Sequence, residues 1–259
     1  MPERVSSRRF RARVEYDGTD FAGFQLQLNA RTVQGELEAA LARLSGGERI
    51  VVDGAGRTDT GVSAAGQVIG FTYRGGLDGP ALRQAVNALL PPDVAIRGVR
   101  RVPDRFHPRY AARYREYRYT VWNGPRSPLR ERHALGVRSP LDIAAMASAG
   151  SVFEGRHDFS SFGGTGRSPV RTVHSVRVRR EGRLVTIDVR AESFLRGQVR
   201  RMVAALLEVG LGTLDAEGLR TALAGPGPAL NGASAPAKGL CLRRVVLGGR
   251  PSDDKEDEE

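Results

Sequence analysis

Residues 184–210, LVTIDVRAESFLRGQVRRMVAALLEVG, join an alternating segment to an amphipathic one. Apolar side chains occupy every second position in residues 184–190, which is typical of a strand with one buried face. In residues 198–210 the apolar side chains recur three and four positions apart, which predicts a helix that ends near Gly210. This change of period from two to 3.6 predicts a fold that mixes strands and helices.

The same order of elements occurs twice along the chain. The first half predicts strands at residues 10–16, 50–53, 67–71 and 94–102, and helices at 33–44 (with Thr32 as N-cap) and 80–89. The second half predicts strands at residues 114–122, 176–179, 184–190 and 240–247, and helices at 141–150 and 198–210. Each half therefore reads β-α-β-β-α-β, the split-βαβ pattern, although the two halves share no evident sequence identity.

We therefore expect an α+β protein with two ferredoxin-like halves around an extended antiparallel sheet. The halves are expected at residues 1–104 and 105–250. Proline and glycine cluster in residues 225–239, which predicts a long loop. The acidic residues 251–259 are expected to be a disordered tail.

The charge balance favours a polyanionic partner. The formal net charge of the chain is +11, and residues 253–259 contribute −5, so the rest of the chain carries +16. Most of the cations are arginines, which bind phosphate through two parallel hydrogen bonds and stack on bases. Because neutralised phosphates release counterions, such a surface favours nucleic acid. For the charge alone, a solvated basic surface without a partner is the alternative.

Composition also excludes several classes of protein. Hydrophobic residues make up 40% of the chain, which suffices for a sizeable core and argues against wholesale disorder. No run of eighteen apolar residues is present, and the basic residues 1–13 lack the apolar segment of a secretory signal. The single cysteine, Cys241, excludes an intramolecular disulfide and a multi-cysteine zinc site. These features predict a cytoplasmic protein that does not associate with membranes.

A glycine-rich loop between two expected strands contains the first candidate for chemistry. Residues 54–64 read GAGRTDTGVSA, so that three glycines flank Arg57, Thr58 and Asp59. Glycine permits tight turns and the close approach of a ligand to the backbone, which makes Asp59 a candidate for the floor of a cleft. A turn aspartate that accepts hydrogen bonds from its own backbone is the alternative. The loop lacks the Gly-Lys-Ser/Thr of a phosphate-binding Walker loop.

The histidines do not indicate a metal site. Their spacing does not match a zinc-binding pattern, and we expect them to be surface or structural residues. They are His107, His133, His157 and His174.

Residues 56–64, GRTDTGVSA, resemble the catalytic G-R-T-D-x-G-V-x-A loop of the TruA pseudouridine synthases. Two earlier stretches look like the family's opening motif and its first helix, at residues 16–25 (YDGTDFAGFQ) and 32–38 (TVQGELE). Later motifs follow in family order, at residues 106–112 (FHPRYAA), 115–119 (REYRY), 157–162 (HDFSSF), 171–173 (RTV), 193–203 (SFLRGQVRRMV) and 236–240 (PAKGL). The similarity runs from about residue 10 to residue 247, and the motifs together are far more specific than any one of them.

The resemblance implies an isomerase that converts uridine to pseudouridine at positions 38–40 of the anticodon stem-loop of tRNA. The reaction breaks the C1′–N1 glycosidic bond, rotates the uracil and rejoins it through C5. Because it involves no redox change or phosphoryl transfer, we expect it to need neither a metal nor a cofactor. Asp59 corresponds to the catalytic aspartate, so residues 1–104 are expected to carry the catalytic loop, and the aspartate is expected to act on a flipped uridine in a central catalytic cleft. Attack on C1′, addition to C6 and removal of a proton from C2′ all stay open for its carboxylate.

The resemblance also assigns roles to two residues of the second half. Arg200 corresponds to the ion-pair partner of Asp59, and a nearby cation would oppose the rise in pKa that burial of a carboxyl group causes. Tyr117 corresponds to the active-site tyrosine, which would stack on the uracil. The alternatives are a phosphate contact for Arg200 and sheet packing for Tyr117. Tyr119 lies two residues further along the same strand face, so the two tyrosines can exchange roles.

Three more residues are expected to bind the substrate. Arg57 would fill the gap left by the flipped base, and Thr58 lies beside it in the same loop. Leu240 matches a position that lines the uracil pocket, although a plain core leucine is the alternative. The wider basic surface would bind the tRNA body by its shape and phosphates. The family is homodimeric, so we expect a homodimer in which one tRNA spans both subunits.

The chain departs from the family pattern at a few positions. Arg196 and Gly197 stand where the family usually has Tyr-His, and Ala22 and Ser63 stand where histidine is frequent.

Two other functions stay open. A non-catalytic RNA-binding protein on the same scaffold has no need of a carboxylate that faces RNA. A small-molecule transferase on a ferredoxin-like scaffold would show no salt-dependent affinity for tRNA.

Overall fold

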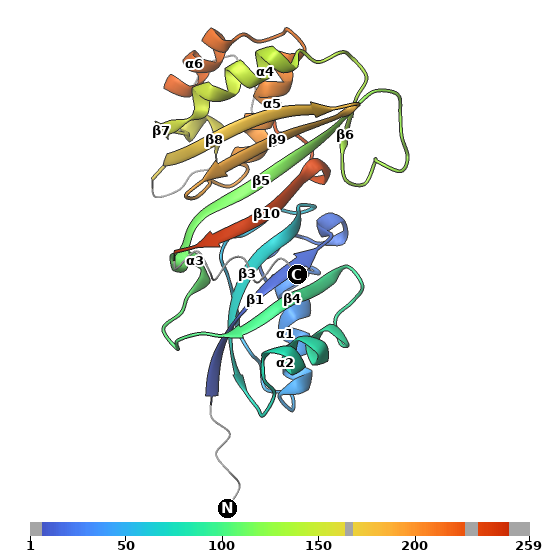
Figure 1. Ribbon diagram of the computed structural model, residues 1–259, viewed down its shortest axis with the longest axis vertical. Coiled ribbons are helices and arrows are strands. Elements are labelled where there is room, and N and C mark those ends of the chain that lie inside the picture. Colours follow the sequence, from blue (N-terminus) through green and yellow to red (C-terminus); the bar gives the residue numbers. More distant parts are fainter. Residues whose placement is uncertain (1–6, 164–167, 226–232, 249–259) are drawn as a thin grey trace, which may run out of the picture. The chain divides into compact units, whose positions relative to one another are not determined.

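The computed structural model describes residues 7–163, 168–225 and 233–248. Its class is mixed α+β, as the sequence predicts, and ten strands form a mixed sheet (Figure 1). Contacts divide the chain into two compact units. Unit 1 combines Met1–Arg113 with Leu242–Glu259, and unit 2 is Tyr114–Cys241. The expected acidic tail and residues 226–232 of the proline- and glycine-rich segment lie outside the described residues.

Unit 1 follows the order β-α-β-β-α-β and then adds a short helix. β1 pairs antiparallel with β3 and with β4, and β2 pairs antiparallel with β3. These pairings give the ladder β4-β1-β3-β2. The elements are β1 (Ser7–Tyr16), α1 (Val33–Leu44), β2 (Val52–Gly54), β3 (Ser63–Arg74), α2 (Gly79–Asn87), β4 (Val94–Arg101) and α3 (Pro108–Ala111).

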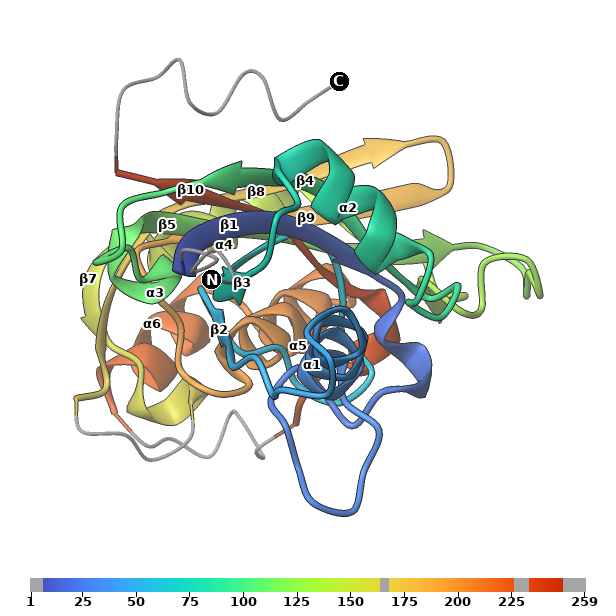
Figure 2. The same ribbon diagram turned by 90° about the horizontal axis from the view of Figure 1, so that it is seen from below.

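The core of unit 1 follows from the alternation of β1. Phe10, Ala12 and Val14 are buried, whereas the arginines between them are partly exposed. The ring of Phe10 stacks on that of Phe71, its partner on β3, at a centroid distance of 6.0 Å. Figure 2 shows α1 against one face of these strands. The helix begins as predicted, because Thr32 is its N-cap and accepts a hydrogen bond from the Gly35 amide.

Unit 2 contains more elements than the sequence predicts. β5, β9, β8 and β7 form an antiparallel ladder in that order. The elements are β5 (Ala112–Asn123), β6 (Leu135–Val137), α4 (Ile143–Gly150), β7 (Gly155–Asp158), β8 (Val170–Glu181), β9 (Leu184–Ala191), α5 (Gln198–Gly210) and α6 (Ala216–Ala224), and the chain then enters β10 (Leu240–Leu247), where it returns to unit 1. The first two residues of β5 and most of β10 belong to unit 1.

One expectation about the sheet is wrong. β6 runs parallel to β5, so the sheet is mixed and not antiparallel throughout. A parallel neighbour needs a crossover instead of a hairpin, and the chain makes it through the long loop after Asn123. None of the helices in the described parts of the chain combines the length and apolar character needed to cross a membrane.

Candidate active site

The glycine-rich loop lies between β2 and β3 in unit 1, where the sequence predicts it. Its three candidate residues differ in exposure. Arg57 is exposed, Asp59 is partly buried, and Thr58 is only 6% exposed. The loop therefore presents Arg57 and Asp59 on either side of an internal threonine.

A second segment, residues 21–24, hydrogen-bonds to the loop on both sides of Asp59. The Phe24 amide donates to the Thr58 carbonyl at 3.1 Å, and the Gly61 amide donates to the Phe21 carbonyl at 3.2 Å. Gly23 lies in this segment with φ +99°, and a Cβ added there would lie 2.8 Å from the Thr58 carbonyl oxygen. Only glycine therefore permits this close approach.

Side chains from β1 and from the start of β3 add to this support. The Tyr16 hydroxyl and Thr58 Oγ1 form a buried hydrogen bond of 2.8 Å. The Gly18 amide donates to Ser63 Oγ at 3.0 Å. Ser63, one of the departures from the family pattern, therefore has a structural partner in this chain. The motif at residues 16–25 thus surrounds the loop, a role that the sequence does not reveal.

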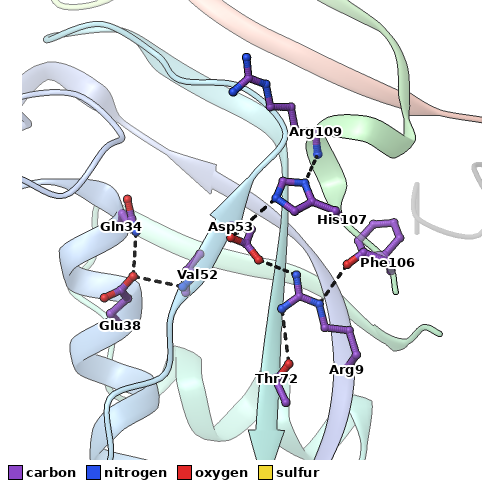
Figure 3. Close-up of polar contacts among 9 residues, drawn as sticks. All are labelled: Arg9, Gln34, Glu38, Val52, Asp53, Thr72, Phe106, His107 and Arg109. Carbon is purple, nitrogen blue, oxygen red and sulfur yellow. Dashed lines mark hydrogen bonds and ion pairs between the residues drawn. The ribbon is translucent and has the colours of Figure 1, made fainter. Parts of the chain in front are cut away.

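A buried carboxylate fixes β2, the strand that leads into the loop (Figure 3). Glu38 of α1 is 5% exposed, and its Oε1 accepts from the Val52 amide at 3.1 Å and from Gln34 Nε2 at 2.8 Å. Its Oε2 forms an ion pair with Arg49 at 2.8 Å. Gln34 in turn accepts from the Leu26 amide at 2.9 Å. Helix α1 therefore connects the segment after Phe24 to β2.

The next residue of β2 makes an ion pair on the other side. Asp53 Oδ2 lies 2.6 Å from Arg9 Nη2 of β1, and Asp53 Oδ1 lies 3.9 Å from His107 Nε2 (Figure 3). Arg9 also donates through Nε to the Phe106 carbonyl at 3.2 Å. The strand before the loop is thus bound to β1 and to the segment before α3.

Tyr119 of unit 2 is fully buried, and its hydroxyl donates to the Pro236 carbonyl at 2.9 Å. Burial raises the pKa of Tyr119 above its ordinary value, and the charge of Arg200 opposes that rise. Arg200 of α5 donates through Nε to the Ala235 carbonyl at 2.7 Å. The two side chains therefore bind adjacent carbonyls in the segment that leads to Leu240, which is 5% exposed.

Tyr117 has a different environment on the same strand face. It is 8% exposed, and its ring meets the Phe194 ring edge-on at a centroid distance of 5.3 Å. Phe194 precedes α5, whose N-cap Gly197 has φ +72°. That left-handed conformation favours glycine, which accounts for one departure from the family pattern.

The candidate residues thus fall into two groups. Arg57, Thr58 and Asp59 share one loop of unit 1. Unit 2 carries the rest, and there Tyr119, Arg200 and the segment before Leu240 come together. The pairing of Asp59 with Arg200 joins residues of different units and stays a prediction. Within the described residues, no group of three or more His, Cys, Asp or Glu side chains is arranged to bind a metal.

Comparison with known proteins gives consistent matches. The family model described as tRNA pseudouridine synthase matches residues 12–111 and 149–246. The chain is 43% identical over 237 residues to tRNA pseudouridine synthase A of Syntrophotalea carbinolica, which covers 90% of this chain and 94% of that protein. It is 43% identical over 243 residues to tRNA pseudouridine synthase A of Brevibacillus brevis, and this match covers 92% of this chain and 99% of that protein. The Pseudothermotoga lettingae enzyme of the same name is 41% identical, with the same coverage.

Proposed function

Because the chain belongs to the tRNA pseudouridine synthase A family, whose members are isomerases, we propose that it modifies uridines 38–40 of the tRNA anticodon stem-loop with Asp59 as the nucleophile. Uridine and pseudouridine are isomers, so the reaction needs no net oxidant or reductant. The C1′–N1 bond breaks, the uracil turns, and a C1′–C5 bond forms. The proton that leaves C5 is balanced by one that N1 gains.

The observation that carries this proposal is the fixed backbone around Asp59. Backbone hydrogen bonds with Phe24 and Phe21 hold Thr58 and Gly61, on either side of Asp59 in the chain, and the Tyr16 hydroxyl bonds to the side chain of Thr58. A nucleophile on a loop with so many supports needs little reorganisation when the substrate arrives. A turn aspartate without a catalytic role would have no need of these supports.

Arg57 is the proposed occupant of the gap that base flipping leaves. Its exposure beside Asp59 supports this role, because the side chain is available to enter an RNA stem. Flipping costs a few kcal/mol, and an arginine that replaces the lost stacking offsets part of this cost. Thr58 is too buried to reach far into solvent, so its substrate contact would be through its backbone.

In unit 2 we assign Tyr117 to the uracil, Arg200 to the charge of Asp59, and Leu240 to the uracil pocket. The hydroxyl of Tyr119 is already bonded to the Pro236 carbonyl, which favours a structural role for Tyr119. Arg200 uses Nε for the Ala235 carbonyl, so its terminal nitrogens are the ones proposed to face a carboxylate.

Several broader features are part of the same proposal. They are two ferredoxin-like halves at residues 1–104 and 105–250 with an acidic tail at 251–259, a homodimer that binds one tRNA across both subunits, and action in the cytoplasm. The β-α-β-β-α-β order of unit 1 supports the first of these. The large positive charge supports the binding of tRNA through its backbone.

The decisive experiment incubates unmodified tRNA with the pure protein and maps pseudouridine by mass spectrometry. We expect product at one or more of positions 38, 39 and 40. Asp59→Asn should abolish release of tritium from tRNA that carries 5-tritiated uridine, while tRNA binding persists. Asp104→Asn, which changes an exposed carboxylate in the same unit, is the control and should keep full activity.

Two results would contradict the proposal. Tritium release by the Asp59→Asn variant would show that Asp59 is not the nucleophile. Salt-sensitive tRNA binding by the native protein without any product would instead support a non-catalytic RNA-binding protein.

A further inference from the structure

Several exposed cationic side chains lie close together in sequence in the loop that follows β5 in unit 2. Residues 124–133 read GPRSPLRERH, and Figure 1 shows this stretch extending away from the strands near β6. Arg126, Arg130 and Arg132 are all exposed. We call residues 124–133 the arginine loop. Its position between two strands makes it an appendage of the sheet and not part of the core.

The only acid of the arginine loop is already engaged. Glu131 Oε1 forms an ion pair with Lys238 Nζ. The hydrogen bond from Lys238 holds the pKa of the Glu131 carboxyl group below its usual range, and the nearby charges of Lys238 and Arg126 act in the same direction. The loop and Lys238 together carry four cations and one acid, so the surface is strongly positive. Lys238 also lies two residues before Leu240, so the ion pair connects the loop to the segment proposed to line the uracil pocket.

The arginine loop has a defined conformation. Trp122 Nε1 donates to the Pro125 carbonyl at 2.7 Å, and the Arg130 guanidinium lies 5.7 Å from the centroid of the Trp122 ring. Within the loop, the Arg130 amide donates to the Ser127 carbonyl at 3.0 Å. A surface that is ordered before binding loses less conformational entropy when a partner arrives.

The arginine loop also exposes an apolar side chain. Leu129 is 95% exposed and lies directly before Arg130. An exposed leucine among arginines matches a ribose or base edge between phosphates. Arginine also binds phosphate oxygens through two parallel hydrogen bonds, which a flexible lysine-rich surface does not. The chemistry of the loop therefore fits an RNA backbone.

We propose that the arginine loop binds backbone phosphates of the tRNA substrate outside the reacting nucleotide. This inference rests on the proposed function, because it takes tRNA as the substrate. The Glu131–Lys238 ion pair then links a remote phosphate contact to the segment that ends at Leu240. The loop determines where the tRNA body lies, while the residues around Asp59 act on the flipped base.

The test removes the three charges in the full chain with Arg126→Gln, Arg130→Gln and Arg132→Gln. The dissociation constant for tRNA is measured over a series of salt concentrations, and the rate at saturating tRNA is measured in a single turnover. Each lost phosphate contact lowers the slope of log affinity against log salt by about 0.7 to 0.9, so we expect a slope that is smaller by about 2 to 3. The rate at saturation should be unchanged.

The matched control removes three exposed arginines of β7 and β8 in the same unit, with Arg156→Gln, Arg177→Gln and Arg179→Gln. It changes the net charge equally, so an equal fall in slope would show a general charge effect and overturn the proposal. If the triple variant does not fold, Arg126→Gln with Arg132→Gln keeps the Arg130–Trp122 contact, and a slope smaller by at least 1 is expected for it.

Two further measurements exclude other partners. Sedimentation of the triple variant should give the native oligomeric state; a shift toward smaller species would make the loop a contact between copies of the chain. Binding to vesicles with phosphatidylserine should be absent in the native protein, and strong binding that the triple variant loses would overturn the proposal in favour of a membrane.

If the native protein makes no pseudouridine, the proposed function fails, whereas the slope comparison still decides whether the loop binds RNA.

Discussion

The hydroxyl of Tyr16 lies 2.8 Å from Oγ1 of Thr58, and both residues are buried inside unit 1. Tyr16 is the last residue of β1, and Thr58 directly precedes Asp59. One hydrogen bond therefore connects a central strand of the unit to the loop that carries the proposed nucleophile. Because both partners are out of water, loss of the Tyr16 hydroxyl removes the bond that it makes with the buried hydroxyl of Thr58.

Tyr16→Phe should therefore slow catalysis and lower stability. A buried donor or acceptor left unsatisfied costs about 1–3 kcal/mol, so urea unfolding should show a loss of that size. The single-turnover rate should fall while the dissociation constant for tRNA stays the same, since Tyr16 is too buried to contact RNA. Thr58→Val removes the other partner, and the double variant should lose less than the sum of the two single losses. Additive losses with an unchanged rate would show that the bond does not position Asp59.

Gly23→Ala should displace the loop. The new Cβ would lie 2.8 Å from the Thr58 carbonyl oxygen at a φ of +99°, so the backbone around Asp59 must move. We expect a large fall in the single-turnover rate together with lower thermal stability. Gly46→Ala is the control, because Gly46 also has a positive φ of +64° but has no neighbour within 4 Å of the added Cβ. Gly46→Ala should lower stability by about 1–2 kcal/mol, which is the cost of placing a residue with a Cβ in the left-handed conformation. The single-turnover rate should not change. Equal rates for the Gly23→Ala and Gly46→Ala variants would show that the close approach of Gly23 to Thr58 does not position Asp59.

Glu38→Gln tests the carboxylate that fixes β2. The substitution keeps the size of the side chain but removes the charge that accepts from Val52, Gln34 and Arg49. Because hydrogen bonds to charged groups are each worth about 1.5–3 kcal/mol, we expect a loss in this range by urea unfolding. Glu36→Gln, a change in the same helix, breaks a more exposed ion pair with Arg31 and should cost less than about 1 kcal/mol. A similar small loss for both variants would mean that Glu38 does not fix β2.

The two tyrosines of β5 can be separated by removal of their hydroxyls. Tyr119→Phe breaks the bond to the Pro236 carbonyl, so it should lower stability by about 1 kcal/mol and leave the rate at saturating tRNA close to native. Tyr117→Phe keeps the ring that contacts Phe194 and removes the hydroxyl, which we propose to assist the transfer of the proton that leaves C5. It should lower the rate with little change in melting temperature. The reverse pattern would exchange their roles.

The long elements could be predicted from the sequence because their signals are local. Helix α1 has Thr32 as N-cap and a regular apolar stripe, and it lies at the predicted residues. Helix α5 is equally regular. The short β6 and β7 have no such pattern, because a strand of three or four residues is defined by its pairing partner. The parallel direction of β6 depends on the path of the preceding loop, which composition does not specify.

For the candidate site, the sequence located the loop of Asp59 but not its supports. Motif similarity identified residues 16–25 without giving them a role, because the amino-acid sequence alone does not show that Tyr16 lies beside Thr58. The buried position of Glu38 was equally hidden, since a glutamate in a helix is usually solvated. Such contacts between residues far apart in the chain appear only once the fold is known.

The hydrogen bonds from residues 21–24 to the loop of Asp59 have a consequence for protein engineering. A transplant of residues 54–64 alone would leave behind the backbone donors, the close glycine and the tyrosine hydroxyl that shape the loop. The transplanted segment must run at least from residue 16 to residue 68 and include α1, because Gln67 and Val68 of β3 also hydrogen-bond to the loop. Recombination breakpoints between homologues should therefore lie outside that span, so that the whole of it comes from one parent.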